Sequence, residues 1–154
     1  MFGFFSPAPA IPRLPKDKVS SAYKAYRIRM FLMIFIGYTG YYLVRKNFAV
    51  ASPYLIDNYG FSKTQIGLIS MGLAVSYGLS KFILGNLSDK SNVKKFICFG
   101  LIASSVLSVL MGFARTVPIF LILMVFNGFF QGMGAPPCSI VLGKWFSQKE
   151  RGLK

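Results

Sequence analysis

Two cationic side chains stand next to each other inside an apolar, aromatic stretch of the sequence, YTGYYLVRKNFAVASPYL, which covers residues 38–55. They are Arg45 and Lys46, and a third cation, Lys81, lies in a second such stretch, SYGLSKFILG. A charged side chain near the middle of a bilayer costs about 2.5–3.5 kcal/mol. These three cations therefore indicate a function, unless Arg45 and Lys46 lie near the end of a span and reach the lipid headgroups, which is the alternative.

Tyrosines accompany these cations at helical spacing. Tyr38 and Tyr42 are four residues apart and Arg45 follows three residues later. Tyr41, four residues before Arg45, is expected on the same helix face. A guanidinium binds a tetrahedral oxyanion through two parallel hydrogen bonds, a lysine acts as a point charge, and phenols add hydroxyl groups. Tyr77 and Lys81 are also four residues apart. We therefore predict an anion site, with phosphate as the best-fitting anion, formed by the faces that carry Tyr38, Tyr42 and Arg45 on one helix and Tyr77 and Lys81 on another.

The remaining chemistry argues against other functions. The chain has four acidic residues and no histidine, and no acid falls within a predicted span, whereas organic-cation exporters and proton pumps rely on intramembrane titratable groups. No nucleophile and base stand at a catalytic spacing. Cys98 and Cys138 match neither a metal-ligand nor a disulfide pattern. We expect neither an enzyme active site nor a bound metal or cofactor.

Four apolar runs must position these residues. The chain of 154 residues is 54% hydrophobic, and each run approaches the roughly 20 residues that a helix needs to cross a bilayer. We predict an all-α membrane protein with four transmembrane helices. The spans cover about 30–51, 66–87, 96–113 and 117–142, and a basic cytoplasmic tail covers 1–29.

The net charge of +14 is distributed by side of the membrane. Basic residues gather before the first span, after the second and after the fourth, whereas the other two loops hold only Lys63 and Arg115. Under the positive-inside rule, the tail, the second loop and the C-terminus are cytoplasmic. Because topology accounts for the charge, we expect contact with membrane lipid and no nucleic-acid binding. The tail near Tyr23 to Arg29 is expected to lie against the inner leaflet.

The segment GNLSDKSNVKK after the second span resembles the loop motif of the major facilitator superfamily. In that motif a glycine is followed by an aspartate and basic residues, here Gly85, Asp89, Lys90 and Lys94. Asn92 stands where a second glycine is usual, and asparagine tolerates the left-handed backbone that such a turn needs. We expect this loop to take part in conformational change; an ordinary basic loop is the alternative.

The segment NGFFQGMGAPPCS in the fourth predicted span carries small residues and prolines. Gly128 and Gly132 form a small-xxx-small pair that favours helix packing. Pro136 and Pro137 should kink or interrupt the helix. Packing is also favoured over ligand contact for Gln131.

Together GYYLVRKNFA, SYGLSKFILGNLSDKSN, GFFQGMGAPPC and KWFSQKERG resemble the organophosphate:phosphate antiporter family, and most of all its glycerol-3-phosphate transporters. The resemblance implies two six-helix halves around a central cavity, and exchange of inorganic phosphate for an organic phosphate. Glycerol-3-phosphate is the first candidate, with hexose phosphate or phosphoglycerate as alternatives. It also implies that Arg45 is a principal phosphate ligand and that Tyr38, Tyr42, Lys46, Tyr77 and Lys81 line the same cavity.

Such proteins continue beyond the position that matches Lys154. We therefore expect a fragment of a longer protein, or a truncated reading frame, whose partner is the remainder of the same transporter. A sugar-phosphate sensor of the same family shares the binding residues and stays open as an alternative. A self-sufficient four-helix membrane protein that works as a homo-oligomer is the other alternative.

Overall fold

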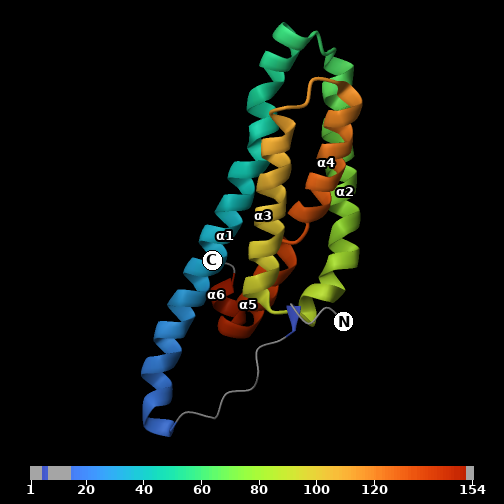
Figure 1. The fold of residues 1–154 in the computed structure, drawn as a ribbon. Coiled ribbons are helices and arrows are strands. Elements are labelled where there is room, and N and C mark those ends of the chain that lie inside the picture. The colour runs from blue at the N-terminus through green and yellow to red at the C-terminus, as the bar shows by residue number, and fades with distance from the viewer. Residues whose placement is uncertain (1–4, 7–14, 152–154) are drawn as a thin grey trace.

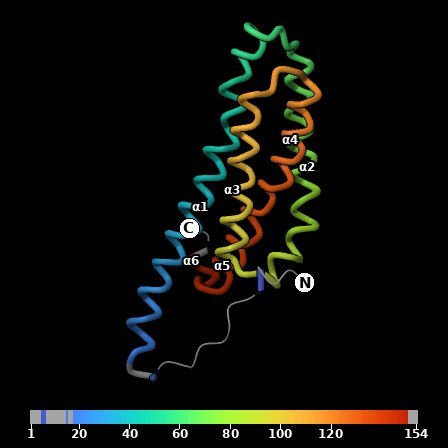
Figure 2. The backbone as a smooth tube through the Cα atoms, viewed as in Figure 1, coloured from blue at the N-terminus to red at the C-terminus, as the bar shows by residue number. Residues whose placement is uncertain are grey.

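The computed structural model describes residues 5–6 and 15–151, and its regular elements in this part of the chain are all helices. They form an elongated bundle in which the chain runs repeatedly from one end to the other (Figures 1 and 2). The six helices among these described residues are α1 (Lys16–Tyr59), α2 (Lys63–Asp89), α3 (Val93–Met111), α4 (Val117–Gln131), α5 (Ala135–Trp145) and α6 (Gln148–Arg151).

Helix α1 is a single continuous helix of 44 residues. The described part of the predicted basic tail continues straight into the first predicted span and projects past the bundle (Figure 1). Its contact with the inner leaflet stays a prediction. No glycine or proline occurs between Lys16 and Ile36, so nothing in that stretch breaks the helix. The helix ends at Gly60, whose φ of 66° is the left-handed conformation that glycine adopts most readily.

In the described part of the chain, three helical segments are long and apolar enough to cross a membrane: Lys63–Asp89, Val93–Met111 and Val117–Trp145, the last comprising α4 and α5. Helix α1 is not among them, because Arg45, Lys46 and several tyrosines interrupt its apolar stretch. It nevertheless runs along the bundle and packs against α3 and α5. The predicted all-α membrane fold is confirmed, with three apolar spans and α1 as the further helix.

The helix expected over 117–142 is divided into α4 and α5. Helix α4 ends at Gln131, Gly132 to Gly134 form a turn, and α5 begins at Ala135. Pro136 and Pro137 lie in the first turn of α5, where backbone N–H groups have no intrahelical partner and proline is tolerated. The predicted interruption is therefore present.

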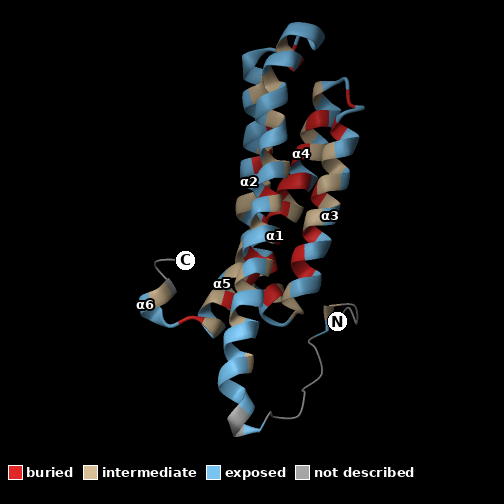
Figure 3. Cartoon of the chain, turned by 90° about the vertical axis from the view of Figure 1, so that its left-hand side faces the viewer, coloured by how far each residue is buried: buried red, intermediate tan, exposed pale blue. Residues whose placement is uncertain are grey.

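Helices α2 and α4 pack closely along their length. A Cβ atom at Gly128 would lie 2.5 Å from the carbonyl oxygen of Leu73, and one at Gly132 would lie 1.7 Å from the Ser80 hydroxyl oxygen. Side chains at these positions would push the two helices apart. Figure 3 shows the buried residues on the inward faces of the helices, with large exposed surfaces outside. An apolar exterior such as Phe82, which is 84% exposed, suits contact with lipid tails.

Candidate substrate-binding site

Three of the predicted site residues meet around one aromatic ring. The Arg45 Cζ atom lies 4.4 Å from the centroid of the Tyr77 ring, and the Lys81 Nζ atom lies 4.1 Å from the same centroid. Arg45 comes from α1, whereas Tyr77 and Lys81 lie one turn apart on α2. A cation within about 6 Å of an aromatic ring centroid is attracted by the ring quadrupole. Tyr77 therefore holds cations from two helices next to each other.

These cations have no internal counter-ion. Among residues 15–150, where side chains are described except at 16 and 17, neither Arg45, Lys46 nor Lys81 forms an ion pair. Two positive charges that share one ring repel each other, and burial in a membrane raises the cost of that repulsion. The cluster of Arg45, Tyr77 and Lys81, called the cation cluster below, therefore has the charge to accept an anion.

Tyr38 and Tyr42 form a neighbouring pair on α1. Their ring centroids are 5.1 Å apart in an edge-to-face arrangement. Both tyrosines line a cavity of about 410 Å³ between α1 and α5, together with Cys138 and Ser139. Tyr42 precedes Arg45 by three residues, or about one helical turn. The tyrosine pair thus adjoins the cation cluster.

Lys46 is set apart from the other predicted site residues. It follows Arg45 directly, and adjacent residues of an α-helix point about 100° apart. Its side chain is exposed, and among the described residues it makes no hydrogen bond, ion pair or cation–π contact. The structure therefore brings five of the six predicted residues together and leaves Lys46 on a neighbouring face of α1.

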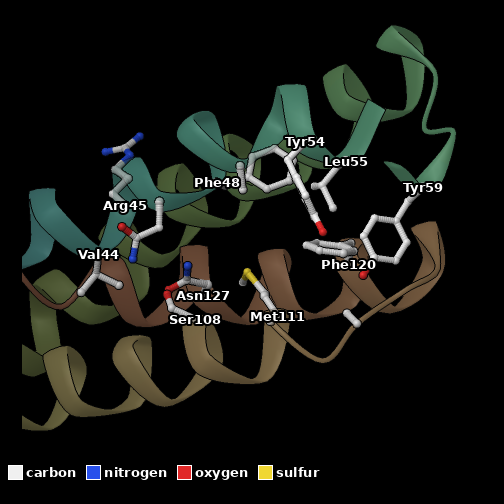
Figure 4. Close-up of a pocket in the computed structure, with 14 residues that line it drawn as sticks. Val44, Arg45, Phe48, Tyr54, Leu55, Tyr59, Ser108, Met111, Phe120 and Asn127 are labelled. Carbon is white, nitrogen blue, oxygen red and sulfur yellow. The ribbon is translucent and has the colours of Figure 1, made fainter. Parts of the chain in front are cut away.

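A second cavity, of about 220 Å³, lies on the other side of Arg45 between α1 and helices α3 and α4. Figure 4 shows the Arg45 side chain extending away from Ser108 and Asn127, toward the opposite side of α1. The cavity walls near Phe48, Leu55 and Phe120 are apolar. This cavity therefore receives only the stem of Arg45, and the charge of Arg45 is directed toward Tyr77.

Tyr41 does not share the face of Arg45 that its spacing predicted. It is 3% exposed, and its hydroxyl donates a hydrogen bond of 3.0 Å to the carbonyl oxygen of Ile97 on α3. The expectation failed because four-residue spacing turns a helix by about 40° past a full turn, which is enough to point one side chain at a neighbouring helix. Tyr41 is a packing residue.

A buried polar network behind the site was not anticipated. The Ser104 hydroxyl on α3 donates to the Asn127 side-chain oxygen on α4, and the Gln131 amide donates to Ser104 Oγ at 3.0 Å and to the Tyr41 carbonyl at 3.5 Å. The network joins α1, α3 and α4 and satisfies polar groups that hydrocarbon cannot. The signal was present in the four-residue spacing of Asn127 and Gln131 in an apolar helix.

The predicted loop motif lies between α2 and α3. Asp89 ends α2, and Lys90 and Lys94 are exposed beside it. Asn92 does not adopt the left-handed conformation, since its φ is −70° and its ψ is 110°. Its side chain instead caps α3 by accepting a hydrogen bond of 3.3 Å from the Lys95 backbone N–H. An asparagine at a helix N-cap gains this bond without any glycine-like conformation. Gly85 lies one helical turn beyond Lys81, whereas Asp89 lies about 12 Å along α2 from Lys81.

Comparison with known proteins finds relatives of this chain that are named as transporters. A family model described as the Major Facilitator Superfamily matches residues 31–154. The chain is 48% identical to the glycerol-3-phosphate transporter of Bacillus subtilis over 158 aligned residues, which cover 100% of this chain and 35% of the relative. It is 43% identical to the phosphoglycerate transporter protein of Salmonella typhimurium, covering 91% of this chain and 30% of the relative.

A relative with a different role is similar over nearly the same length. The chain is 39% identical to the membrane sensor protein UhpC of Escherichia coli, covering 96% of this chain and 34% of that protein. The chain thus spans about a third of the length of the curated relatives it matches.

Proposed function

Because the chain belongs to the major facilitator superfamily, we propose that it is part of a secondary transporter that carries an organic phosphate across the cell membrane in exchange for inorganic phosphate. Glycerol-3-phosphate is the first candidate substrate, since the relative from Bacillus subtilis is a glycerol-3-phosphate transporter. Organic and inorganic phosphate share the phosphoryl group, so one site serves both exchange partners in turn.

The cation cluster is the observation that carries this proposal. Arg45 and Lys81 lie within 4.4 Å and 4.1 Å of one ring centroid and have no carboxylate partner in the described residues. A phosphate dianion neutralises two charges at once. The guanidinium of Arg45 offers two parallel N–H donors to a pair of phosphate oxygens, and Lys81 offers a point charge. Tyr38 and Tyr42 add phenol hydroxyls at the edge of the same region.

The experiment is phosphate exchange by the complete protein in sealed vesicles. Vesicles loaded with radiolabelled phosphate should release label when glycerol-3-phosphate is added outside, and should retain it when glycerol is added. Competition by hexose phosphate and phosphoglycerate then ranks the substrates. Release of label that does not depend on any external phosphate compound would contradict the exchange mechanism.

A sugar-phosphate sensor is the second candidate, favoured by the similarity to UhpC over 96% of this chain. A sensor uses the same cations to bind its ligand but does not need to move it. Equilibrium binding of a sugar phosphate with no exchange of label would therefore favour the sensor over the transporter.

The proposed orientation places the N-terminus and the α2–α3 loop in the cytoplasm, because basic residues gather at that end of the bundle. We predict that a cysteine in place of Asn58, which is exposed at the other end of α1, reacts with an impermeant thiol reagent added to intact cells. The background should carry Cys98→Ser and Cys138→Ser, since both thiols are free. Reaction only after permeabilisation would reverse the orientation.

A further inference from the structure

The end of the bundle that carries the basic residues contains a groove unrelated to the cation cluster. The groove has a volume of about 330 Å³ and lies between the early turns of α1 and the segment after α5; its lining residues are Lys24, Arg27, Ile28, Phe31, Leu32 and Phe146. Two cations therefore stand at one end of a surface that is otherwise apolar. Ile28 and Leu32 are 62% and 48% exposed, so the apolar part is open to its surroundings.

Neighbouring aromatic residues indicate where this groove lies in the membrane. The Tyr23 and Trp145 rings stack with centroids 5.6 Å apart, and the Tyr23 hydroxyl donates a hydrogen bond of 3.0 Å to the Trp145 carbonyl oxygen. Tyrosine and tryptophan are enriched at the level of the lipid headgroups. Lys24 and Arg27 lie within about one turn of Tyr23, and the apolar run of α1 begins just beyond them. The cationic end of the groove is therefore at headgroup depth, and its apolar end enters the hydrocarbon.

The charges of the groove favour an anion. Arg27 is held in place by an ion pair of 2.5 Å with Glu150 and lies 4.5 Å from the centroid of the Phe146 ring. One carboxylate balances one of the two cations, so Lys24, which has no ion pair among the described residues, leaves a net positive charge. Lys144 and Lys149 are exposed next to Trp145 and Glu150 and add to it.

We propose that this groove binds one anionic phospholipid. The headgroup phosphate contacts Lys24 and the donors of Arg27 that face away from Glu150, and one acyl chain lies along Ile28, Phe31 and Leu32. A phospholipid fits because it joins an anion to a hydrocarbon chain at this depth. The proposal does not depend on which substrate the cation cluster binds, so it stands or fails separately.

The experiment measures phospholipid retention by the complete protein, purified in detergent and titrated with phosphatidylglycerol or phosphatidylcholine in mixed micelles, with bound lipid counted by native mass spectrometry. We expect one phosphatidylglycerol molecule to be retained in preference to phosphatidylcholine. Lys24→Gln should weaken that retention about fivefold, which is the effect of losing about one surface cation. Lys18→Gln is the matched control, because Lys18 is exposed on the same helix but does not line the groove.

A second variant keeps the test decisive. Glu150→Gln removes the carboxylate that competes for Arg27 and should leave phosphatidylglycerol retention unchanged or stronger. Equal retention of the two lipids, an equal loss in Lys18→Gln and Lys24→Gln, or weaker retention in Glu150→Gln would each overturn the proposal. Displacement of the lipid by inorganic phosphate at an equal concentration would also overturn it, because the acyl chain would then add no affinity.

Discussion

Helix α1 carries two arginines that lie against aromatic rings at nearly the same distance but differ in their counter-ions. Arg27 lies 4.5 Å from the Phe146 ring centroid and is paired with Glu150 at 2.5 Å. Arg45 lies 4.4 Å from the Tyr77 ring centroid, with the second cation Lys81 on the same ring and no acid among the described residues. Arg27 thus has a carboxylate partner within the described residues, whereas the counter-ion that we propose for Arg45 is a bound ligand.

The difference follows from where each arginine lies. Eighteen residues of helix separate them, or about 27 Å along α1. In the proposed orientation, Arg27 lies where water and headgroups can also satisfy its charge, so we expect the pair with Glu150 mainly to fix the position of the last turns. Arg45 lies within the bundle, where an unpaired cation is costly, and we propose that bound phosphate removes that cost. We therefore expect the presence or absence of a carboxylate partner, rather than the contact with an aromatic ring, to distinguish the role of Arg27 from that of Arg45.

Apart from changing Arg45 itself, giving Arg45 an internal counter-ion should have the largest effect. Ala49 is exposed one turn beyond Arg45 on α1, so Ala49→Glu places a carboxylate at the i, i+4 spacing that favours an ion pair. The carboxylate competes with phosphate, and we expect phosphate affinity to fall about tenfold. Isothermal titration of the complete protein measures it. Ala49→Gln is the control of equal size, and an equal loss in both variants would show that the side chain acts by its bulk.

Removing the shared ring should have a smaller effect. Tyr77→Leu loses the attraction to Arg45 and Lys81, which is about 0.5–1 kcal/mol for a cation–π contact at an exposed site, and phosphate affinity should fall about two- to fivefold. Tyr77→Phe keeps the ring and should bind nearly as wild type. If Tyr77→Phe loses as much affinity as Tyr77→Leu, the hydroxyl rather than the ring holds the site.

Lowering the pH should remove the small contribution that the ion pair between Arg27 and Glu150 makes to stability. The hydrogen bond from Arg27, aided by Ser147, lowers the pKa of Glu150 from 4.5 to about 2. Because the folded pKa is the lower one, the pair contributes its stability above about pH 4.5 and loses it as pH falls toward 2. The melting temperatures of wild type and Glu150→Gln should therefore differ slightly at pH 7 and converge in acid. A difference that stays constant down to pH 3 would show that the carboxylate charge is not the cause.

Much of the fold could be predicted from the sequence, because apolar runs report where hydrocarbon surrounds a helix. The second and third spans were expected over 66–87 and 96–113, and the helices are Lys63–Asp89 and Val93–Met111. Helix α1 was underestimated because hydropathy gives the length of a span and not the length of a helix. The basic residues before Met30 are good helix formers and extend it outward.

The candidate site was predicted in part. Spacing along one helix identified the tyrosine pair on α1 and the pair of Tyr77 and Lys81, because those relationships are local. It could not show which face of α1 meets α3, so Tyr41 was placed wrongly. The pair of Arg27 and Glu150 joins residues 123 positions apart, and no local pattern predicts a contact of that kind.

The most direct test of the account is phosphate binding to the complete protein carrying Arg45→Lys. This substitution keeps the charge but loses the planar fork, which costs about 1.5–3 kcal/mol, or about ten- to a hundredfold in affinity. Lys46→Arg, on the neighbouring face, is the control and should be the milder of the two. The account predicts a severe loss in Arg45→Lys, whereas near-normal phosphate affinity in that variant would contradict it and would mean that Arg45 only reaches for the headgroups.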